Sequence, residues 1–295
     1  DFMHKYRNWF PFLVLLAALI ILHQQCFLRD DDLVFSKQTL SSSFLLERYM
    51  TWSSRVIIES VLIIVLHLPF IIWELMDILL TMGLCMGLSY LFVPKEQRCV
   101  GNWAVVVLYL LYPFEQLSNA GWVATTVNYL WPVAFTVFAM LPLRLLAEGK
   151  EISRRVILFA ALAMIFAQDA ELCWIILAMA YGGTVAVCGF RRQYRFFIGT
   201  QLLITIVMFL KIIFCPGNHK RYISEIYSWF PDYEKITVFD RLDLSLTSTV
   251  GHFFVLPDIM MFVFGIVLVL LVWQCQKNWL WRLFACMPLL LKSVC

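Results

Sequence analysis

Long apolar stretches alternate with short polar ones along the chain, and this pattern predicts helices that cross a membrane. A spanning helix needs about 20 apolar residues. We expect about nine such helices, at residues 9–27, 70–93, 103–118, 129–146, 155–168, 172–190, 196–215, 253–273 and 279–292. The sequence therefore predicts an all-α polytopic membrane protein, with a single transmembrane domain over residues 1–295.

The apolar stretch at residues 55–93 is too long for one crossing. As one helix of 39 residues it would reach roughly 58 Å at 1.5 Å per residue, and Pro69 interrupts it. Either residues 55–68 lie at the membrane interface while residues 70–93 span, or both segments cross.

Positive charge favours the first arrangement, because cytoplasmic loops collect Lys and Arg. The richest short basic loops lie at residues 144–155 and 191–195. Both fall inside only if residues 29–93 contribute one crossing. We therefore expect an interfacial helix at residues 55–68, within an outer loop at residues 29–69.

With this topology, several polar segments fall on the outer side and converge on one face. They are "RDDDLVFSK" (29–37), "LSNAGWVATTVNYLWP" (117–132), "QDAE" (168–171) and an outer loop at 216–252 that begins "PGNHKR". The inner loops are short and basic, and they offer no comparable chemistry.

Composition supports a membrane protein and excludes other classes. The chain is 62% hydrophobic and 15% charged, with a mean hydropathy of +0.80, whereas a soluble domain has roughly 45–50% apolar and about 25% charged residues. A net charge of +3 is too small to indicate a nucleic-acid partner. The nine cysteines form no CxxC pair, so we assign them no metal and no redox role.

The densest charge is the run Asp30, Asp31 and Asp32. A carboxyl group beside a like charge near a low-dielectric boundary has a raised pKa, and it can act as a base or bind a cation. The alternative is a solvated acidic loop that helps to set the topology.

Two further segments offer groups that could bind a sugar. Aromatic faces stack on sugar rings, and amide or carboxylate groups bond sugar hydroxyls. The candidates are Trp122, Asn128, Tyr129, Trp131, Asp169 and Glu171. The alternatives are an aromatic belt at the membrane interface for the first four and simple turn polarity for the two acids.

Cations at the end of a span could bind a lipid phosphate. Lys211 lies within an apolar stretch close to its outer end, where it could also snorkel. Pro216 and Gly217 then break the helix, and His219, Lys220 and Arg221 follow. Four other ionisable residues have no partner suggested by spacing and stay outside the predicted site: Glu74, Asp77, His67 and His252.

The stretches "DDLVFS", "YMTWSSRVI", "NYLWP" and "PGNHKR" give the chain a resemblance to the GT-C superfamily of membrane glycosyltransferases, and within it to a group of bacterial polytopic proteins. The resemblance implies an inverting enzyme in the bacterial cytoplasmic membrane, with its active site facing outside. It implies a sugar donor on a polyprenyl phosphate or pyrophosphate, and a cell-envelope glycan or lipid as acceptor.

In that family an aspartate of the first outer loop is the general base, which here would be Asp31 or Asp32. Asp30 makes a triplet where a pair suffices, so the register stays open. Some members hold a divalent cation near the acid pair; Asp30, Asp31 and Asp32 would hold it here, and the sequence leaves open whether they do.

Two other classes remain alternatives. An outward-facing transporter or flippase would suit Lys211 and the broken helices, but the chain has no internal repeat and its charges gather at the predicted outer rim rather than at mid-membrane. A non-catalytic membrane subunit of an envelope assembly would tolerate substitution of the acids.

Overall fold

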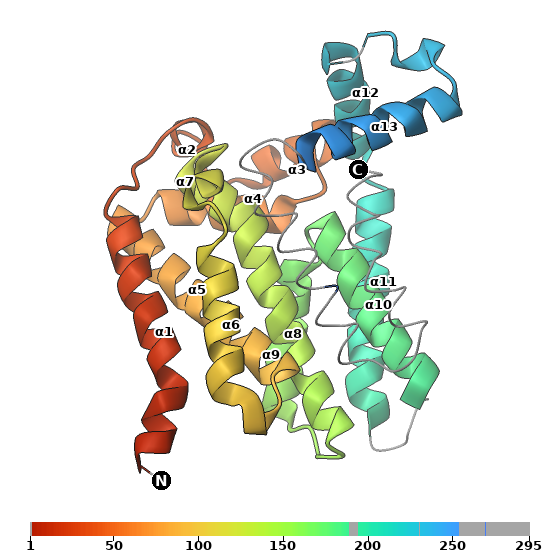
Figure 1. The fold of residues 1–295 in the computed structure, drawn as a ribbon. Coiled ribbons are helices and arrows are strands. Elements are labelled where there is room, and N and C mark those ends of the chain that lie inside the picture. The colour runs from red at the N-terminus through yellow and green to blue at the C-terminus, as the bar shows by residue number, and fades with distance from the viewer. Residues whose placement is uncertain (1, 189–193, 230, 254–268, 270–295) are drawn as a thin grey trace. The chain divides into compact units, whose positions relative to one another are not determined.

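The computed structural model describes residues 2–188, 194–229, 231–253 and 269 (Figure 1). These residues belong to two compact units, one formed by residues 1–107 and 114–222 and the other by residues 108–113 and 223–295. The predicted span at 279–292, and the one at 253–273 apart from residues 253 and 269, lie outside the described residues.

The described part of the chain is helical, which confirms the all-α prediction for these residues. The α-helices are Phe2–His23 (α1), Asp31–Phe35 (α2), Ser42–Thr51 (α3), Val56–Leu66 (α4), Phe70–Phe92 (α5), Arg98–Leu110 (α6), Trp122–Thr125 (α7), Trp131–Ala147 (α8), Arg154–Ala167 (α9), Glu171–Cys188 (α10), Arg195–Ile213 (α11), Pro216–Trp229 (α12) and Val238–Phe253 (α13). Short 3-10 helices lie at Lys95–Gln97 (η1), Phe114–Ser118 (η2) and Tyr233–Lys235 (η5), and a π-helix lies at Thr126–Leu130 (η3).

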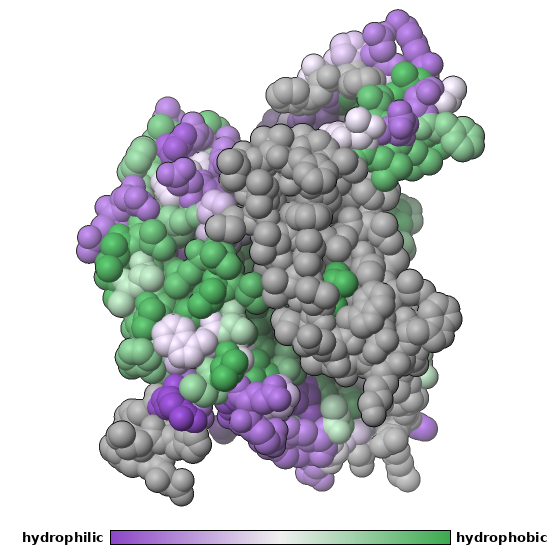
Figure 2. All heavy atoms as spheres, in the orientation of Figure 1, coloured by the Kyte–Doolittle hydropathy of each residue, from purple (hydrophilic) through white to green (hydrophobic). Residues whose placement is uncertain are grey.

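Three helical stretches of the described chain are long and apolar enough to cross a membrane: Phe70–Phe92, Trp122–Ala147 and Arg195–Ile213. Shorter apolar helices lie at Arg7–His23, Val56–Leu66 and Glu171–Ala186. Over the part of the first unit in view, Figure 2 shows a largely hydrophobic middle with hydrophilic residues gathered toward its two ends.

Several predicted boundaries differ from the structure; the helix expected at 9–27, for example, is Phe2–His23. Two of the differences have a clear local reason. The helix expected at 103–118 ends at Leu110, because Pro113 lacks the N–H that a helix needs there. The helix expected at 129–146 begins earlier, at Trp122, because α7 and η3 run directly into α8.

The long apolar stretch divides at Pro69, as the sequence predicts. Pro69 precedes the first residue of α5, and α4 before it has 11 residues. At 1.5 Å per residue α4 is about 16 Å long, about half the thickness of a bilayer core. An interfacial position for this segment remains a prediction, and the length of α4 agrees with it.

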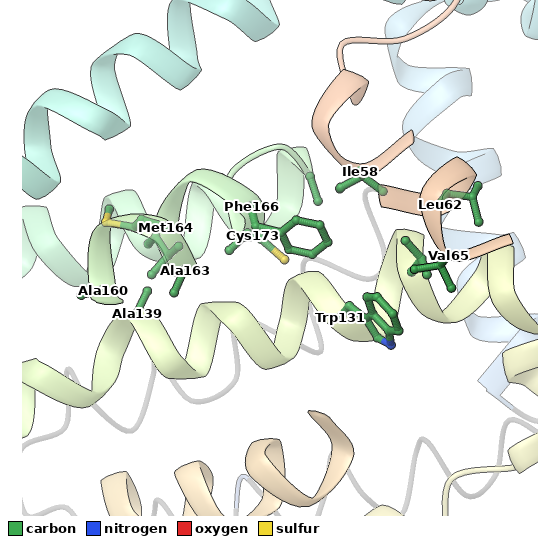
Figure 3. Close-up of a cluster of buried hydrophobic side chains, with 14 of the residues drawn as sticks. Ile58, Leu62, Val65, Trp131, Ala139, Ala160, Ala163, Met164, Phe166 and Cys173 are labelled. Atoms are coloured by element: carbon green, nitrogen blue, oxygen red, sulfur yellow. The ribbon is translucent and has the colours of Figure 1, made fainter. Parts of the chain in front are cut away.

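The core of the first unit joins α4 to the long helices. Figure 3 shows Ile58, Leu62 and Val65 of α4 near Trp131, the first residue of α8, and all four belong to one buried cluster. Farther along α8, Ala139 lies near Ala160 of α9. Small side chains at such positions let two helices approach closely, and α9 packs against α8 here, whereas α4 packs against η3, the turn that leads into α8.

Candidate active site

The predicted site segments gather at one end of the first unit. Figure 1 places α2, α3, α4 and α7 at the end of this unit that lies away from the N-terminus of α1.

The acid cluster divides into two exposed aspartates and one buried one. Asp30 has a φ of 47° and pairs with Arg29, with 2.6 Å between its Oδ2 and Arg29 Nε. Asp31 is exposed on the first turn of α2, whereas Asp32 is 0% exposed. The three neighbours therefore cannot have equivalent roles in this structure.

Asp32 fastens the acid loop to the start of α7. Its Oδ1 accepts a hydrogen bond of 2.7 Å from the backbone N–H of Ala124, and its Oδ2 accepts one of 3.3 Å from that of Arg29. Gly121 makes this approach possible: its φ is +105°, and a Cβ there would lie 2.6 Å from Asp32 Cγ. The first two predicted segments thus meet through the Asp32 side chain.

Burial raises the pKa of Asp32, although backbone N–H groups of Ala124, Arg29, Val123 and Trp122 act in the opposite direction. The folded protein therefore holds this proton more tightly than the unfolded chain. The stabilising effect of protonation is fully present below the ordinary pKa of 3.8 and is lost as the pH rises through the raised value.

We expect Asp32→Asn to abolish this part of the pH dependence of stability, because an amide does not titrate here. Asp32→Ala should instead lower the free energy of unfolding by about 1–3 kcal/mol, since the Ala124 N–H loses its buried partner. Thermal unfolding of both variants and the wild type across pH 4–7 checks this. Equal pH dependence in Asp32→Asn and wild type would contradict it.

The aromatic segment supplies mostly core side chains. Trp131 is buried and its Nε1 donates to Asp77 Oδ1 at 2.7 Å, and Trp122 is also buried. Asn128 Nδ2 donates to Ala124 O at 2.8 Å, while Tyr129 is 57% exposed. Tyr129 is therefore the member of this group best placed to meet a ligand.

Asn128 and Tyr129 lie on the π-helix η3. Such π-turns within α-helices are uncommon and occur frequently at functional sites. η3 lies between α7 and α8, and α7 is at the same end of the unit as α2 of the acid loop (Figure 1).

Asp169 is a fully buried carboxylate that joins three elements. It forms an ion pair with Lys211 Nζ of α11. Its Oδ2 accepts hydrogen bonds from the backbone N–H groups of Ile57 (2.9 Å) and Ile58 (2.8 Å) at the start of α4. A carboxylate at a helix N-terminus satisfies backbone N–H groups that the helix itself leaves without a partner. Asp169 therefore holds the start of α4 in place and also balances the charge of Lys211.

Glu171 binds Arg55, the residue just before α4. Arg55 Nη2 and Nε donate to Glu171 Oε2 at 2.6 and 2.9 Å. The Arg55 guanidinium also lies over the Tyr129 ring, 5.6 Å from its centroid. Burial alone would lower the pKa of Arg55, but the ion pair with Glu171 outweighs it and the pKa is raised. Arg55 therefore stays charged and links the second and third predicted segments.

The fourth segment reaches the same place through the start of α12. Asn218 Oδ1 accepts a 3.0 Å hydrogen bond from Ser54 N. His219 and Lys220 are exposed, and Arg221 is half-buried and interacts electrostatically with Glu171. These contacts join the start of the fourth segment, up to Arg221, to the other three. Whether this end faces outside remains a prediction.

Gly217 of α12 lies directly against backbone, because a Cβ there would be 2.4 Å from Trp52 N and 2.7 Å from Tyr49 O. Gly217→Ala should therefore displace α12 and lower the free energy of unfolding by about 1–3 kcal/mol. Thermal unfolding measures the change. Gly183→Ala in α10 is the control, because a Cβ there meets nothing within 4 Å; equal effects of the two substitutions would contradict the packing argument.

Sequence reasoning missed the residues that connect the segments. Ser54 and Arg55 stand just before an apolar stretch, which is a known signal for a helix start but not for a site. It also left out Asp77, which accepts from Trp131 and lies 3.0 Å from His23 Nε2. Both Asp77 partners are 54 residues away in the sequence, so spacing could not reveal them.

Metal ligands do not gather in the described part of the chain. No group of three or more His, Cys, Asp or Glu side chains lies there in a position to hold a metal ion, and this includes Asp30, Asp31 and Asp32. Comparison of the chain with protein-family models, curated proteins and solved structures gives no match.

Proposed function

We propose that the chain is a membrane glycosyltransferase of the GT-C type. It moves a sugar from a polyprenyl-phosphate-linked donor to a cell-envelope glycan or lipid, at the outer face of a bacterial cytoplasmic membrane. The proposal is supported by a chain of contacts in a unit with membrane-length helices: the loop with the exposed Asp31 is held to α7 through Asp32, and Arg55 joins the exposed Tyr129 to Glu171. Asn218, at the start of the basic segment, binds the neighbouring Ser54.

Asp31 is the general base in this proposal, and Asp32 positions it. Asp32 is buried and its oxygens are engaged by backbone N–H groups. Asp31 is exposed, and its own backbone N–H donates to Ala120 O at 3.1 Å, which holds the start of α2 in place. An accessible carboxylate on a fixed backbone is what a base needs.

The reaction is a single displacement. Asp31 takes the proton of an acceptor hydroxyl while the oxygen of that hydroxyl bonds to the anomeric carbon of the sugar. The bond from that carbon to the donor oxygen breaks, and the lipid phosphate leaves with the electron pair. Direct attack from the opposite side inverts the anomeric centre.

The leaving phosphate needs cations at the membrane surface, because developing negative charge is stabilised by fixed positive groups. His219, Lys220 and Arg221 supply them at the start of α12. Lys211 forms an ion pair with the buried Asp169. Its role in the proposal is therefore to hold the site together, and His219, Lys220 and Arg221 contact the phosphate.

Tyr129 offers its ring to the sugar, and Glu171 offers carboxylate oxygens to sugar hydroxyls. Arg55 lies between them and keeps both in place. Trp122, Trp131 and Asp169 support this arrangement from the interior, since all three are buried.

Donor binding tests the phosphate part of the proposal. Lys220→Ala combined with Arg221→Ala should raise the KM for a polyprenyl-phosphate sugar by about 10-fold or more, because charge-assisted contacts to the donor are lost. The measurement is sugar transfer in proteoliposomes over a range of donor concentrations.

Lys150→Ala is the matched control, because Lys150 is an exposed lysine of a predicted inner loop and pairs with Glu148. It should leave the KM unchanged. An unchanged KM in the double variant, with normal protein levels, would contradict the assignment of these cations.

A further inference from the structure

Two glutamines within the first unit are buried with unused hydrogen-bonding atoms. Gln201 of α11 is 0% exposed, and among the described residues neither its Oε1 nor its Nε2 has a partner. Gln168, at the end of α9, is also 0% exposed and its Oε1 is likewise without a partner there. Buried amides are ordinarily bonded, so these atoms call for an explanation.

Thr205 connects Gln168 to α11, and Gln201 lies one turn before Thr205 on that helix. Gln168 Nε2 donates to Thr205 Oγ1 at 2.9 Å, and Thr205 Oγ1 donates to Gln201 O at 2.9 Å. Gln201 and Thr205 are four residues apart on α11 and therefore share a helix face. Trp174 Nε1 of α10 donates to Thr205 O at 2.9 Å, so α9, α10 and α11 all contribute to these contacts.

Gln201 and Thr205 lie close to the middle of a membrane-length helix. At 1.5 Å per residue, Gln201 is about 9 Å and Thr205 about 15 Å from the first residue of α11, whose whole length is about 28 Å. A polar group left unbonded in hydrocarbon is strongly unfavourable. The three atoms on Gln168 and Gln201 therefore indicate that a partner with complementary groups binds there.

We propose that Gln168 and Gln201 form an intramembrane binding site for a small neutral ligand that carries hydroxyl groups. The two Oε1 atoms accept hydrogen bonds from O–H groups, and Gln201 Nε2 donates to a hydroxyl oxygen. A neutral ligand fits because Asp169, which follows Gln168 in the chain, is already matched by Lys211. Water and a polyol share this chemistry.

The site goes beyond sugar transfer at the end of the bundle. Polar groups near mid-membrane are where membrane proteins hold water or solutes inside the bundle. The site does not depend on the transferase proposal, because it shares no residue with the base or the phosphate-binding cations.

A double-mutant cycle tests the site in the full-length protein. The variants are Gln201→Met, Gln168→Met and both together, compared by thermal unfolding in detergent. We expect Gln201→Met to lower the Tm by on the order of 3 °C, because ligand contacts are lost. The double variant should fall by less than the sum of the singles, because both side chains address one ligand. Thr200→Val should change little, because Thr200 is only half-buried and its hydroxyl donates to Phe196 O of its own helix.

A Tm that does not fall would contradict the binding site. If the amides are dry, replacing Gln201 by an apolar side chain of similar size removes an unsatisfied group and raises the Tm. A raised or unchanged Tm for Gln201→Met overturns the proposal, and so does a loss that is strictly additive with that of Gln168→Met.

Repeating the cycle with glycerol and with a larger polyol identifies the ligand. A coupling between the two sites that is unchanged by either compound assigns the site to water. A coupling that grows and saturates with one polyol assigns it to that solute.

Discussion

Lys211→Met should lower the free energy of unfolding by about 3–5 kcal/mol, because removing one partner of a buried pair leaves an uncompensated charge. Asp169 is 0% exposed, and its other oxygen is held by the N–H groups of Ile57 and Ile58. The carboxylate cannot turn to solvent without releasing the start of α4. Chemical unfolding of the purified variant in detergent measures the loss.

Two controls separate the pair from a general effect of removing a lysine. Lys150→Met breaks an exposed pair with Glu148 and should cost no more than about 1 kcal/mol. Combining Lys211→Met with Asp169→Asn should recover part of the stability, because the buried charge is gone. A double variant less stable than Lys211→Met alone would contradict this account of the pair.

Asp31→Asn should reduce sugar transfer by a factor on the order of 10²–10⁴, because the amide keeps the shape of the carboxylate but cannot accept the proton. Its Tm should stay close to that of the wild type, since Asp31 is exposed. Transfer from a polyprenyl-phosphate sugar in proteoliposomes checks the activity.

Asp30→Asn is the matched control on the neighbouring residue. Asp30 pairs with Arg29 at the surface, and its loss should change transfer only slightly. Full activity in Asp31→Asn would make the acid run a solvated topology signal. It would also favour the transporter or the non-catalytic subunit over the enzyme.

Much of the fold could be predicted from the chain because local rules set it. Apolar runs of membrane length gave α5 and α11, and Pro69 marked the break between α4 and α5. The break at Pro113 was overlooked, although the same rule applies there. The π-helix η3 could not be foreseen, because a shift in backbone hydrogen bonding leaves no pattern of apolar positions.

The candidate site was predicted as a set of segments but not as a set of contacts. The topology argument placed Asp169, Glu171 and Lys211 toward one side without pairing them; in the structure Asp169 pairs with Lys211 and Glu171 with Arg55. The partners Arg55 and Glu171 are 116 residues apart, and Asp32 and Ala124 are 92 apart. Which of three adjacent aspartates is buried depends on such tertiary contacts, so the sequence left the base open between Asp31 and Asp32.

Turnover by the purified wild-type protein tests the central claim most directly. Proteoliposomes that contain only this chain are given a polyprenyl-phosphate sugar and an extract of cell-envelope glycans and lipids, and the appearance of free polyprenyl phosphate is followed with time. The glycosyltransferase account predicts steady release with matching sugar incorporation, far above protein-free liposomes. Release no faster than in protein-free liposomes, from a folded and correctly inserted protein, would contradict it.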